Sequence, residues 1–266
     1  MIETVVHHLT DPRGATVCLR EDRAVPDPGQ GHTCAILLHG MFSSSQGNKI
    51  RSLGELLARQ GVTALRPDFI ARGDSPGVDR DICMSAQLAN LAAVKAHAEA
   101  TLAPARYVLM GSSFGALTAL LSLYAGPDNH AALFRQDELL ALVLVALPHR
   151  TDFTTGLLPN RESAAAFEKA GFVRYQGHDI DYRMHRELLG YPSVAGMLSG
   201  VEIPTLLIHG EADGLFPAHE VAALLDLSPA AVKEMVVVPG ADHRIDEPAY
   251  RAQLLEAVMR FLEPLL

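Results

Sequence analysis

The sequence lacks most of the features that mark secreted or disulfide-bonded proteins. Its 266 residues include only three cysteines, Cys18, Cys34 and Cys83, and no Cys-x-x-Cys pair. An odd number of scattered cysteines is typical of a reducing compartment, so we expect a cytoplasmic protein. The first residues contain no basic segment followed by an apolar run, and we therefore expect no secretory signal.

Blocks of positive charge and long apolar runs are also missing. Lysine and arginine total 22 against 31 acidic residues, which gives a formal net charge of −9 and argues against nucleic acid as a partner. The longest apolar stretch, Leu139–Leu147, is about half as long as a membrane-spanning helix requires. The expected partner is therefore a small molecule, and a second copy of the chain, as a homodimer, is a further candidate.

Short apolar runs alternate with amphipathic helical patterns along most of the chain. The runs lack polar alternation, which is typical of parallel strands buried on both faces. They predict strands over Cys34–Leu38, Val62–Leu65, Tyr107–Met110, Leu139–Ala146, Thr205–Ile208 and Glu234–Val238. The second of these is expected to end before Pro67.

The N-terminal segment has a different pattern. Thr4–Leu9 and Thr16–Arg20 flank the turn sequence Asp11-Pro12-Arg13-Gly14, which predicts an antiparallel hairpin at one edge of the sheet. Helical patterns lie between the remaining strands, and one near Phe114–Tyr124 is apolar nearly all round. We therefore predict the α/β class, with a mostly parallel sheet covered by helices on both faces.

Residues 148–200 interrupt this alternation. They contain a helical piece near Glu162–Lys169, a small hairpin that turns near Gly177, and a second short helix over Met184–Leu189. We interpret residues 148–200 as a cap or lid inserted into a core made of residues 1–147 and 201–266. The alternative is an inserted segment that only packs on the protein surface and has no role in substrate choice.

The pattern Gly-x-Ser-x-Gly occurs at Gly111–Gly115, between a predicted strand and a predicted buried helix. A sharp strand-to-helix turn projects the hydroxyl of its central residue, Ser113, and the flanking glycines avoid backbone clashes. The start of the following helix directs amide N–H groups toward any anion that forms there. In this context the motif predicts that Ser113 is a nucleophile.

A serine hydroxyl needs a general base, and two later strand ends provide candidates. Asp213 follows the strand Thr205–Ile208, and His243 follows the last predicted strand. The ends of parallel strands face one crevice, so Ser113, Asp213 and His243 can meet there. We predict His243 as the general base and Asp213 as the acid that orients it. Glu211 and Asp242 remain alternative acids.

Acyl transfer also requires hydrogen-bond donors for an oxyanion. The backbone N–H of Phe114, directly after the predicted nucleophile, is one candidate. The second comes from the turn after Cys34–Leu38, where Gly40 allows close approach; we predict the N–H of Met41, with Phe42 as the alternative. His39 is interpreted as a structural residue of this turn.

On these motifs the chain resembles the α/β-hydrolase superfamily over nearly its whole length. Within it, the His-Gly turn, the loop Asp68–Ser75 and the helix-plus-hairpin insert resemble bacterial cinnamoyl (feruloyl) esterase-like carboxylesterases. The resemblance implies a mostly parallel eight-stranded sheet and hydrolysis of a carboxylic ester through an acyl-enzyme. It also implies a triad of Ser113, Asp213 and His243, with Met41 and Phe114 at the oxyanion hole.

The predicted function is thus that of a serine carboxylesterase, with a small-molecule ester as substrate. Phe42, Phe153, Tyr175 and Tyr182 are the predicted pocket residues. Two alternatives remain: an amide hydrolase, C–C hydrolase or acyltransferase with the same triad, and a non-catalytic binding protein with this fold. No cofactor or metal is expected, because His7-His8 has no further ligands at metal-binding spacing.

Overall fold

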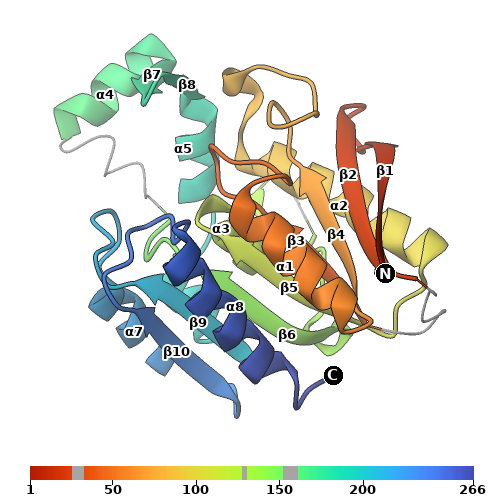
Figure 1. Cartoon of the computed structure of the whole chain (residues 1–266). Helices are drawn as coiled ribbons and strands as arrows, with labels where there is room; N and C mark the ends of the chain where they lie inside the picture. Colours follow the sequence, from red (N-terminus) through yellow and green to blue (C-terminus); the bar gives the residue numbers. More distant parts are fainter. Residues whose placement is uncertain (26–32, 128–130, 152–160) are drawn as a thin grey trace.

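A computed structural model describes residues 1–25, 33–127, 131–151 and 161–266. One eight-stranded sheet runs through the molecule in the order β1-β2-β4-β3-β5-β6-β9-β10 (Figure 1). Its strands are β1 (Ile2–Thr10), β2 (Thr16–Ala24), β3 (Thr33–Leu38), β4 (Thr63–Asp68), β5 (Arg106–Ser112), β6 (Leu139–Val145), β9 (Thr205–Gly210) and β10 (Lys233–Val238). β2 pairs antiparallel with β1 and β4, and the other pairs are parallel. The predicted fold class and edge hairpin are confirmed.

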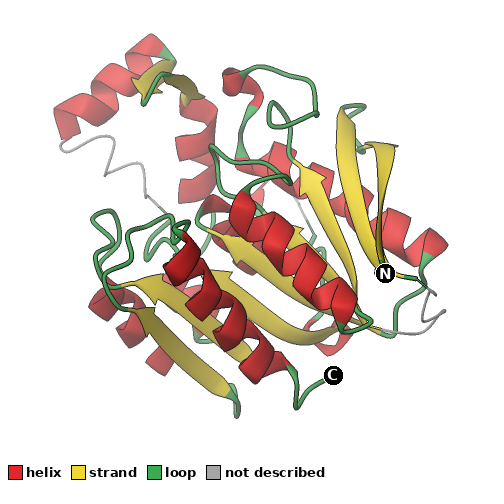
Figure 2. Ribbon diagram, viewed as in Figure 1, coloured by secondary structure: helices red, strands yellow, loops and turns green. Residues whose placement is uncertain are grey.

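Helices cover both faces of this sheet (Figure 2). One face packs against α1 (Asn48–Arg59) and α8 (Pro248–Leu262). The opposite face packs against α2 (Met84–Thr101), α3 (Phe114–Leu121), α5 (Tyr182–Leu189), α6 (Val194–Leu198) and α7 (Ala218–Asp226). None of the described helices is long and apolar enough to cross a bilayer.

Strand β3 shows why the central strands are apolar without alternation. Ile36 and Leu38 belong to the core under α2 and α3, whereas Ala35 and Leu37 belong to the core under α1 and α8. Successive side chains of a strand point to opposite faces, so a strand between two helical layers needs apolar residues at every position. This two-sided burial fixes the sheet in the middle of the domain.

The structure differs from the sequence-based prediction at Pro67. We expected the strand to stop before this proline, but β4 continues to Asp68. Proline cannot donate a hydrogen bond, so it is tolerated where a ladder is incomplete. The pairing of β3 with β4 ends at Leu65, and beyond it β4 pairs only with β2, where Pro67 faces Leu19.

The predicted helix and hairpin of the inserted segment are present. Helix α4 (Arg161–Ala170) precedes a separate two-stranded sheet made of β7 (Phe172–Tyr175) and β8 (His178–Asp181), and the chain turns at Gly177 with a φ of 87°. Figure 1 shows α4, β7 and β8 outside the main sheet. Glu187 of α5 accepts hydrogen bonds from the backbone N–H and hydroxyl of Ser85, both at 2.8 Å, which joins this segment to the start of α2.

Candidate active site

Ser113 lies in the sharp turn between β5 and α3, in a backbone conformation that side chains rarely adopt (φ 54°, ψ −118°). Its N–H donates to the carbonyl of Val145 at 2.8 Å, which holds the strained turn in place. A Cβ on Gly111 would lie 2.2 Å from the carbonyl oxygen of Gly115, and one on Gly115 would lie 2.3 Å from that of Leu38. Both glycines of the motif are therefore required by close backbone packing.

We expect Gly115→Ala to destabilise the protein by about 3 kcal/mol, because the added methyl group would collide with backbone atoms that cannot rotate away. Gly214→Ala is the matched control, since a Cβ there meets no atom within 4 Å. Urea unfolding of the two variants measures the difference. Equal midpoints for both variants would show that the turn does not need a glycine at position 115.

The three predicted catalytic side chains lie in one hydrogen-bonded line. The hydroxyl of Ser113 lies 2.8 Å from Nε2 of His243, and Nδ1 of His243 lies 2.8 Å from Oδ2 of Asp213. Asp213 follows β9 and His243 follows β10, so neighbouring strand ends bring the line together. The Asp213 side chain is fully buried, while that of His243 is 18% exposed.

The hydrogen-bonding partners fix the proton positions in this line. Burial alone would raise the pKa of Asp213, but hydrogen bonds from His209 and His243 outweigh it and hold this pKa well below its usual range. An ionised carboxylate can only accept, so Nδ1 of His243 carries the hydrogen. In the neutral ring with this tautomer, Nε2 of His243 carries the lone pair and can accept the proton of Ser113.

The alternative acids have other partners. Glu211 accepts a hydrogen bond from the N–H of Gly240 at 2.8 Å. Asp242 accepts from the N–H groups of Arg244 and Ile245 at 3.0 and 3.1 Å and so closes the turn that carries His243. Each side chain therefore stabilises a loop next to the site, whereas Asp213 contacts the imidazole.

His209 is a residue of this site that the sequence reasoning missed. It is fully buried, and its Nε2 lies 2.9 Å from Oδ2 of Asp213 and 2.7 Å from the carbonyl oxygen of Phe216. Both partners can only accept, so Nε2 of His209 carries a hydrogen and donates to them. The N–H groups of Leu215 and Phe216 donate to the other Asp213 oxygen. These donors hold the carboxylate in one orientation.

The turn after β3 lies against the predicted nucleophile. A Cβ on Gly40 would lie 3.4 Å from Cβ of Ser113, so this turn approaches closely. Burial lowers the pKa of His39 to about 4, and the neutral ring accepts from the N–H of Phe69 at 3.0 Å and donates to the carbonyl of Gly40 at 2.7 Å. His39 thus connects the turn to the end of β4, as a structural residue would.

Arg72 stabilises the turn after β3, a role that the sequence did not indicate. Its Nε donates to the carbonyl oxygen of Met41, and its Nη1 donates to Asp79 at 2.8 Å. Fixing the Met41 carbonyl orients the peptide plane that follows Met41. Phe114 is the first residue of α3, so its N–H lies in the first turn, where amide groups point out of the helix.

A cavity of about 710 Å³ opens beside Ser113 and His243. Phe42 and Tyr175, two of the residues proposed for a substrate pocket, line it, and their ring centroids lie 6.2 Å apart. Tyr182 is not among the described lining residues; its ring instead packs edge-on against Phe167 at 5.1 Å. Phe153 lies outside the described residues. Ile180 and Gln176 of the hairpin line the cavity although the sequence analysis did not select them.

Lys49 contributes a buried amine to the wall of this cavity. Its side chain extends from the first turn of α1, and Nζ donates to the carbonyl of Arg244 at 2.7 Å. Burial lowers the pKa of Lys49 to about 8 against the attraction of Asp246 and Asp242. Arg244 adjoins His243, so Lys49 anchors the loop that carries the imidazole.

Replacing Lys49 with methionine is expected to change the pH dependence of stability. Between pH 8 and 10.5 the unfolded chain binds a proton on Lys49 that the folded chain has lost, so this residue makes stability rise with pH. The unfolding free energy of the wild type minus that of Lys49→Met should grow by about 3 kcal/mol across this range. Urea unfolding at several pH values measures it, and a constant difference would refute a depressed pKa.

Comparison with known proteins identifies the family. The sequence matches the Alpha/beta hydrolase family over residues 35–257, a span that contains Ser113, Asp213 and His243. The chain belongs to the alpha/beta hydrolase family. No curated protein matches this alpha/beta hydrolase in sequence.

Solved structures with the same fold cover nearly the whole of this alpha/beta hydrolase. Est1E from Butyrivibrio proteoclasticus is 20% identical, with a TM-score of 0.77 over 98% of each chain, and has also been solved with ferulic acid bound. The Pyrococcus furiosus esterase Pf2001 is 21% identical, with a TM-score of 0.70 over 99% of this chain and 91% of that one. Mouse alpha/beta hydrolase domain-containing protein 10 is 18% identical, with a TM-score of 0.73 over 98% of this chain and 100% of that one.

Proposed function

We propose that this alpha/beta hydrolase cleaves carboxylic esters through an acyl-enzyme formed on Ser113. The observation that carries the proposal is the line Ser113–His243–Asp213, with 2.8 Å at each contact, at the wall of a cavity of about 710 Å³. A hydroxyl hydrogen-bonded to an imidazole, which is in turn held by a buried carboxylate, is the arrangement that activates serine as a nucleophile.

In the proposed acylation, Oγ of Ser113 attacks the ester carbonyl carbon while its proton moves to Nε2 of His243. The carbonyl oxygen becomes an oxyanion, which the N–H groups of Met41 and Phe114 stabilise. The bond to the alcohol oxygen then breaks, and His243 gives its proton to the departing alcohol. Asp213 keeps the Nδ1–H tautomer and stabilises the imidazolium that forms between these steps.

Deacylation follows the same route with water in place of the serine hydroxyl. Water attacks the acyl carbon as His243 takes one of its protons, and the oxyanion forms again in the same position. When the bond to Ser113 breaks, the proton returns to Oγ and the carboxylic acid is released. The reaction needs only the groups already named.

We also propose that residues 148–200 act as a cap on a core of residues 1–147 and 201–266. Among the described residues of this segment, Tyr175, Gln176 and Ile180 line the cavity. His178 stacks on Phe42 with ring centroids 4.4 Å apart, which joins the hairpin to the turn that carries Met41. The cap therefore contributes one wall of the proposed substrate pocket.

The lining of the cavity favours an ester with an aromatic acyl group. Phe42, Tyr175 and Phe216 present rings to the cavity, and Lys49 and Gln46 add polar groups. Ferulic acid, the compound bound to Est1E, is an aromatic carboxylic acid of this kind. We propose hydroxycinnamate esters as the substrate class to test first.

The experiment compares three substrate series: p-nitrophenyl esters of increasing chain length, methyl ferulate, and the p-nitroanilide that matches the best ester. An aliphatic methyl ester is the reference for methyl ferulate. We expect ester turnover, with kcat/KM higher for methyl ferulate than for this reference, and little cleavage of the anilide. Cleavage of the anilide alone would replace the proposal with an amide hydrolase. The protein is also treated with a fluorophosphonate. Covalent labelling of Ser113 by this reagent without turnover of any ester would favour C–C hydrolysis or acyl transfer to another acceptor.

A further inference from the structure

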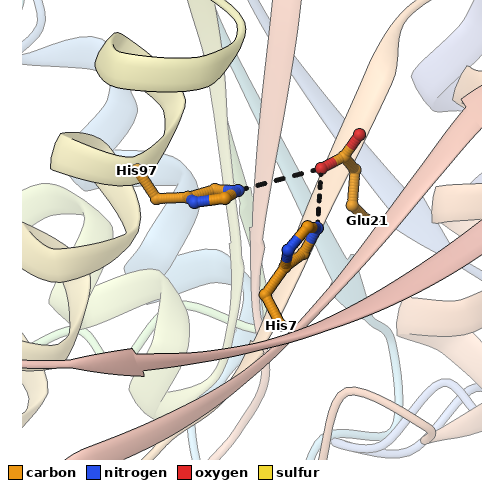
Figure 3. Close-up of side chains that lie close together, drawn as sticks. All are labelled: His7, Glu21 and His97. Carbon is orange, nitrogen blue, oxygen red and sulfur yellow. Dashed lines mark hydrogen bonds and ion pairs between the residues drawn. The ribbon is translucent and has the colours of Figure 1, made fainter.

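Three side chains of the types that bind metal ions converge at the opposite edge of the sheet from His243. His7 of β1, Glu21 of β2 and His97 of α2 direct their polar atoms toward one point (Figure 3). Nε2 of His7 lies 2.9 Å from Oε2 of Glu21, and Nε2 of His97 lies 3.8 Å from the same oxygen. The three ligand atoms lie within 4.8 Å of one another.

This donor set has the chemistry and the spacing of a zinc site. Two imidazoles and one carboxylate bind Zn²⁺ in many proteins, with bonds of about 2.0–2.2 Å. In a tetrahedral site of that size, neighbouring ligand atoms lie about 3.3 Å apart. The distances of 2.9 and 3.8 Å lie on either side of this value, so small side-chain movements would complete the site. A water molecule would take the fourth position.

A purely structural hydrogen bond accounts for only part of this arrangement. His7 and Glu21 form such a bond, but His97 at 3.8 Å is too far from the carboxylate to make one. Its ring nevertheless packs against His7, with centroids 4.5 Å apart. Nε2 of His97 also has a long contact of 3.5 Å with the hydroxyl of Thr101, a weak partner that a metal ion would replace.

The neighbouring arginine approaches Oε1 of Glu21 and not Oε2, the oxygen that faces the two histidines. Arg23 lies 3.6 Å from the other carboxylate oxygen, Oε1 of Glu21, and also pairs with Glu3 at 2.9 Å. The side chains of Glu21 and His97 are 4% and 12% exposed, and that of His7 is 28% exposed, so an ion could enter from the side of β1.

The second cluster of possible ligands, Cys18, Asp68 and Asp74, differs in this respect. The guanidinium of Arg20 already lies between its two carboxylates, with Nη1 2.8 Å from Asp68 and Nη2 bonded to Asp74. The positively charged side chain of Arg20 therefore occupies the position that a metal ion would take.

We propose that His7, Glu21 and His97 form a binding site for a divalent transition-metal ion, with Zn²⁺ as the ion to test. The site lies on β1, β2 and α2, none of which contributes to the line Ser113–His243–Asp213. It thus joins the edge hairpin to the helical layer, and metal binding is expected to stabilise the hairpin.

The test is titration of metal-free protein with Zn²⁺ in competition with a chromophoric chelator. His97→Gln and His7→Gln should each lower the affinity of this site at least 100-fold, since even loss of a group that only supports a metal ligand costs about 10–100-fold. His8→Gln is the matched control, because adjacent strand residues point to opposite faces and His8 is exposed. We expect the wild type and His8→Gln to bind one more Zn²⁺ per chain than the other two variants.

Equal zinc stoichiometry and affinity in all four proteins would overturn the proposal, as would the absence of zinc binding by the wild type. Far-UV circular dichroism establishes that each variant is folded, and two independent ligand variants guard against misfolding of one. Ser113→Ala should bind Zn²⁺ like the wild type, because Ser113 lies far from the proposed metal ligands. Loss of esterase activity in this variant therefore says nothing about the metal proposal, and the two proposals can fail separately. Absorption of bound Co²⁺ provides a second measurement of the same site.

Discussion

Replacing Ser113 with alanine is expected to lower kcat for ester hydrolysis by about 10⁶-fold, with the fold intact. The substitution removes Oγ, the protein atom that bonds to the acyl carbon in the proposed mechanism. The remaining rate then comes from substrate binding and from the oxyanion donors. Loss of one hydroxyl group next to the cavity leaves the core packing unchanged. The measurement is the initial rate on the best p-nitrophenyl ester, with the thermal midpoint determined in parallel.

Ser122→Ala is the matched control for this prediction. Ser122 lies at the other end of helix α3, where its hydroxyl donates to the carbonyl of Ala119 at 2.7 Å. It is buried like the core around it and lies outside the proposed site. We expect this variant to keep the wild-type kcat. If Ser113→Ala also kept it, another residue would have to be the nucleophile.

Asp213→Asn is expected to lower kcat by about 10⁴-fold, with little change in KM. An amide can donate a hydrogen bond to Nδ1 of His243, which favours the tautomer that carries its hydrogen on Nε2. That tautomer cannot accept the proton of Ser113. The asparagine would also lose the charge that stabilises the imidazolium. Its single amide oxygen could still accept from the N–H groups of Leu215 and Phe216, but the amide nitrogen in the place of Oδ2 could not accept from His209.

Asp242→Asn and Glu211→Gln distinguish this effect from a general disturbance of the loops. Their carboxylates contact backbone N–H groups next to the site and have no described contact with His243. We expect both to lose less than about 10-fold in kcat, mainly through lower stability of the turns. A loss of about 10⁴-fold in Asp242→Asn, with Asp213→Asn unaffected, would reassign the acid.

The sequence was most informative where local pattern and chain order agree. Ser113 follows a buried strand and precedes a buried helix, so its turn could be predicted from neighbouring residues. Asp213 and His243 follow two later strands, and parallel topology brings such strand ends to one edge of the sheet. Side chains that lie far apart in sequence could therefore be paired without coordinates.

Residues that depend on packing between distant segments could not be predicted in this way. His209 contacts Asp213 only because the turn after β9 folds back on the strand, and Lys49 of α1 donates to Arg244, which lies far away in the sequence. Arg72 lies in the loop Asp68–Ser75, to which the sequence analysis assigned no contact, yet it donates to the Met41 carbonyl. Tyr182 was wrongly placed relative to the cavity because the face of a short helix depends on its packing partner, here Phe167.

The same limit applies to element ends and short helices. Helices α6 (Val194–Leu198) and α7 (Ala218–Asp226) were not predicted. Five residues are too few to show a helical period, and α7 buries only Val221 and Leu225, which is a weak apolar face. His7 was judged to lack further metal ligands because only spacing along the chain was considered. Its partners Glu21 and His97 come from β2 and α2.

Covalent trapping tests the central claim most directly. The protein is incubated with a fluorophosphonate, which phosphonylates an activated serine, and the modified residue is located by peptide mass spectrometry. We predict one adduct per chain on the peptide that contains Ser113, with much slower labelling in Asp213→Asn and none in Ser113→Ala. A folded wild-type protein that stays unlabelled, or that carries its adduct on a different serine, would contradict the account.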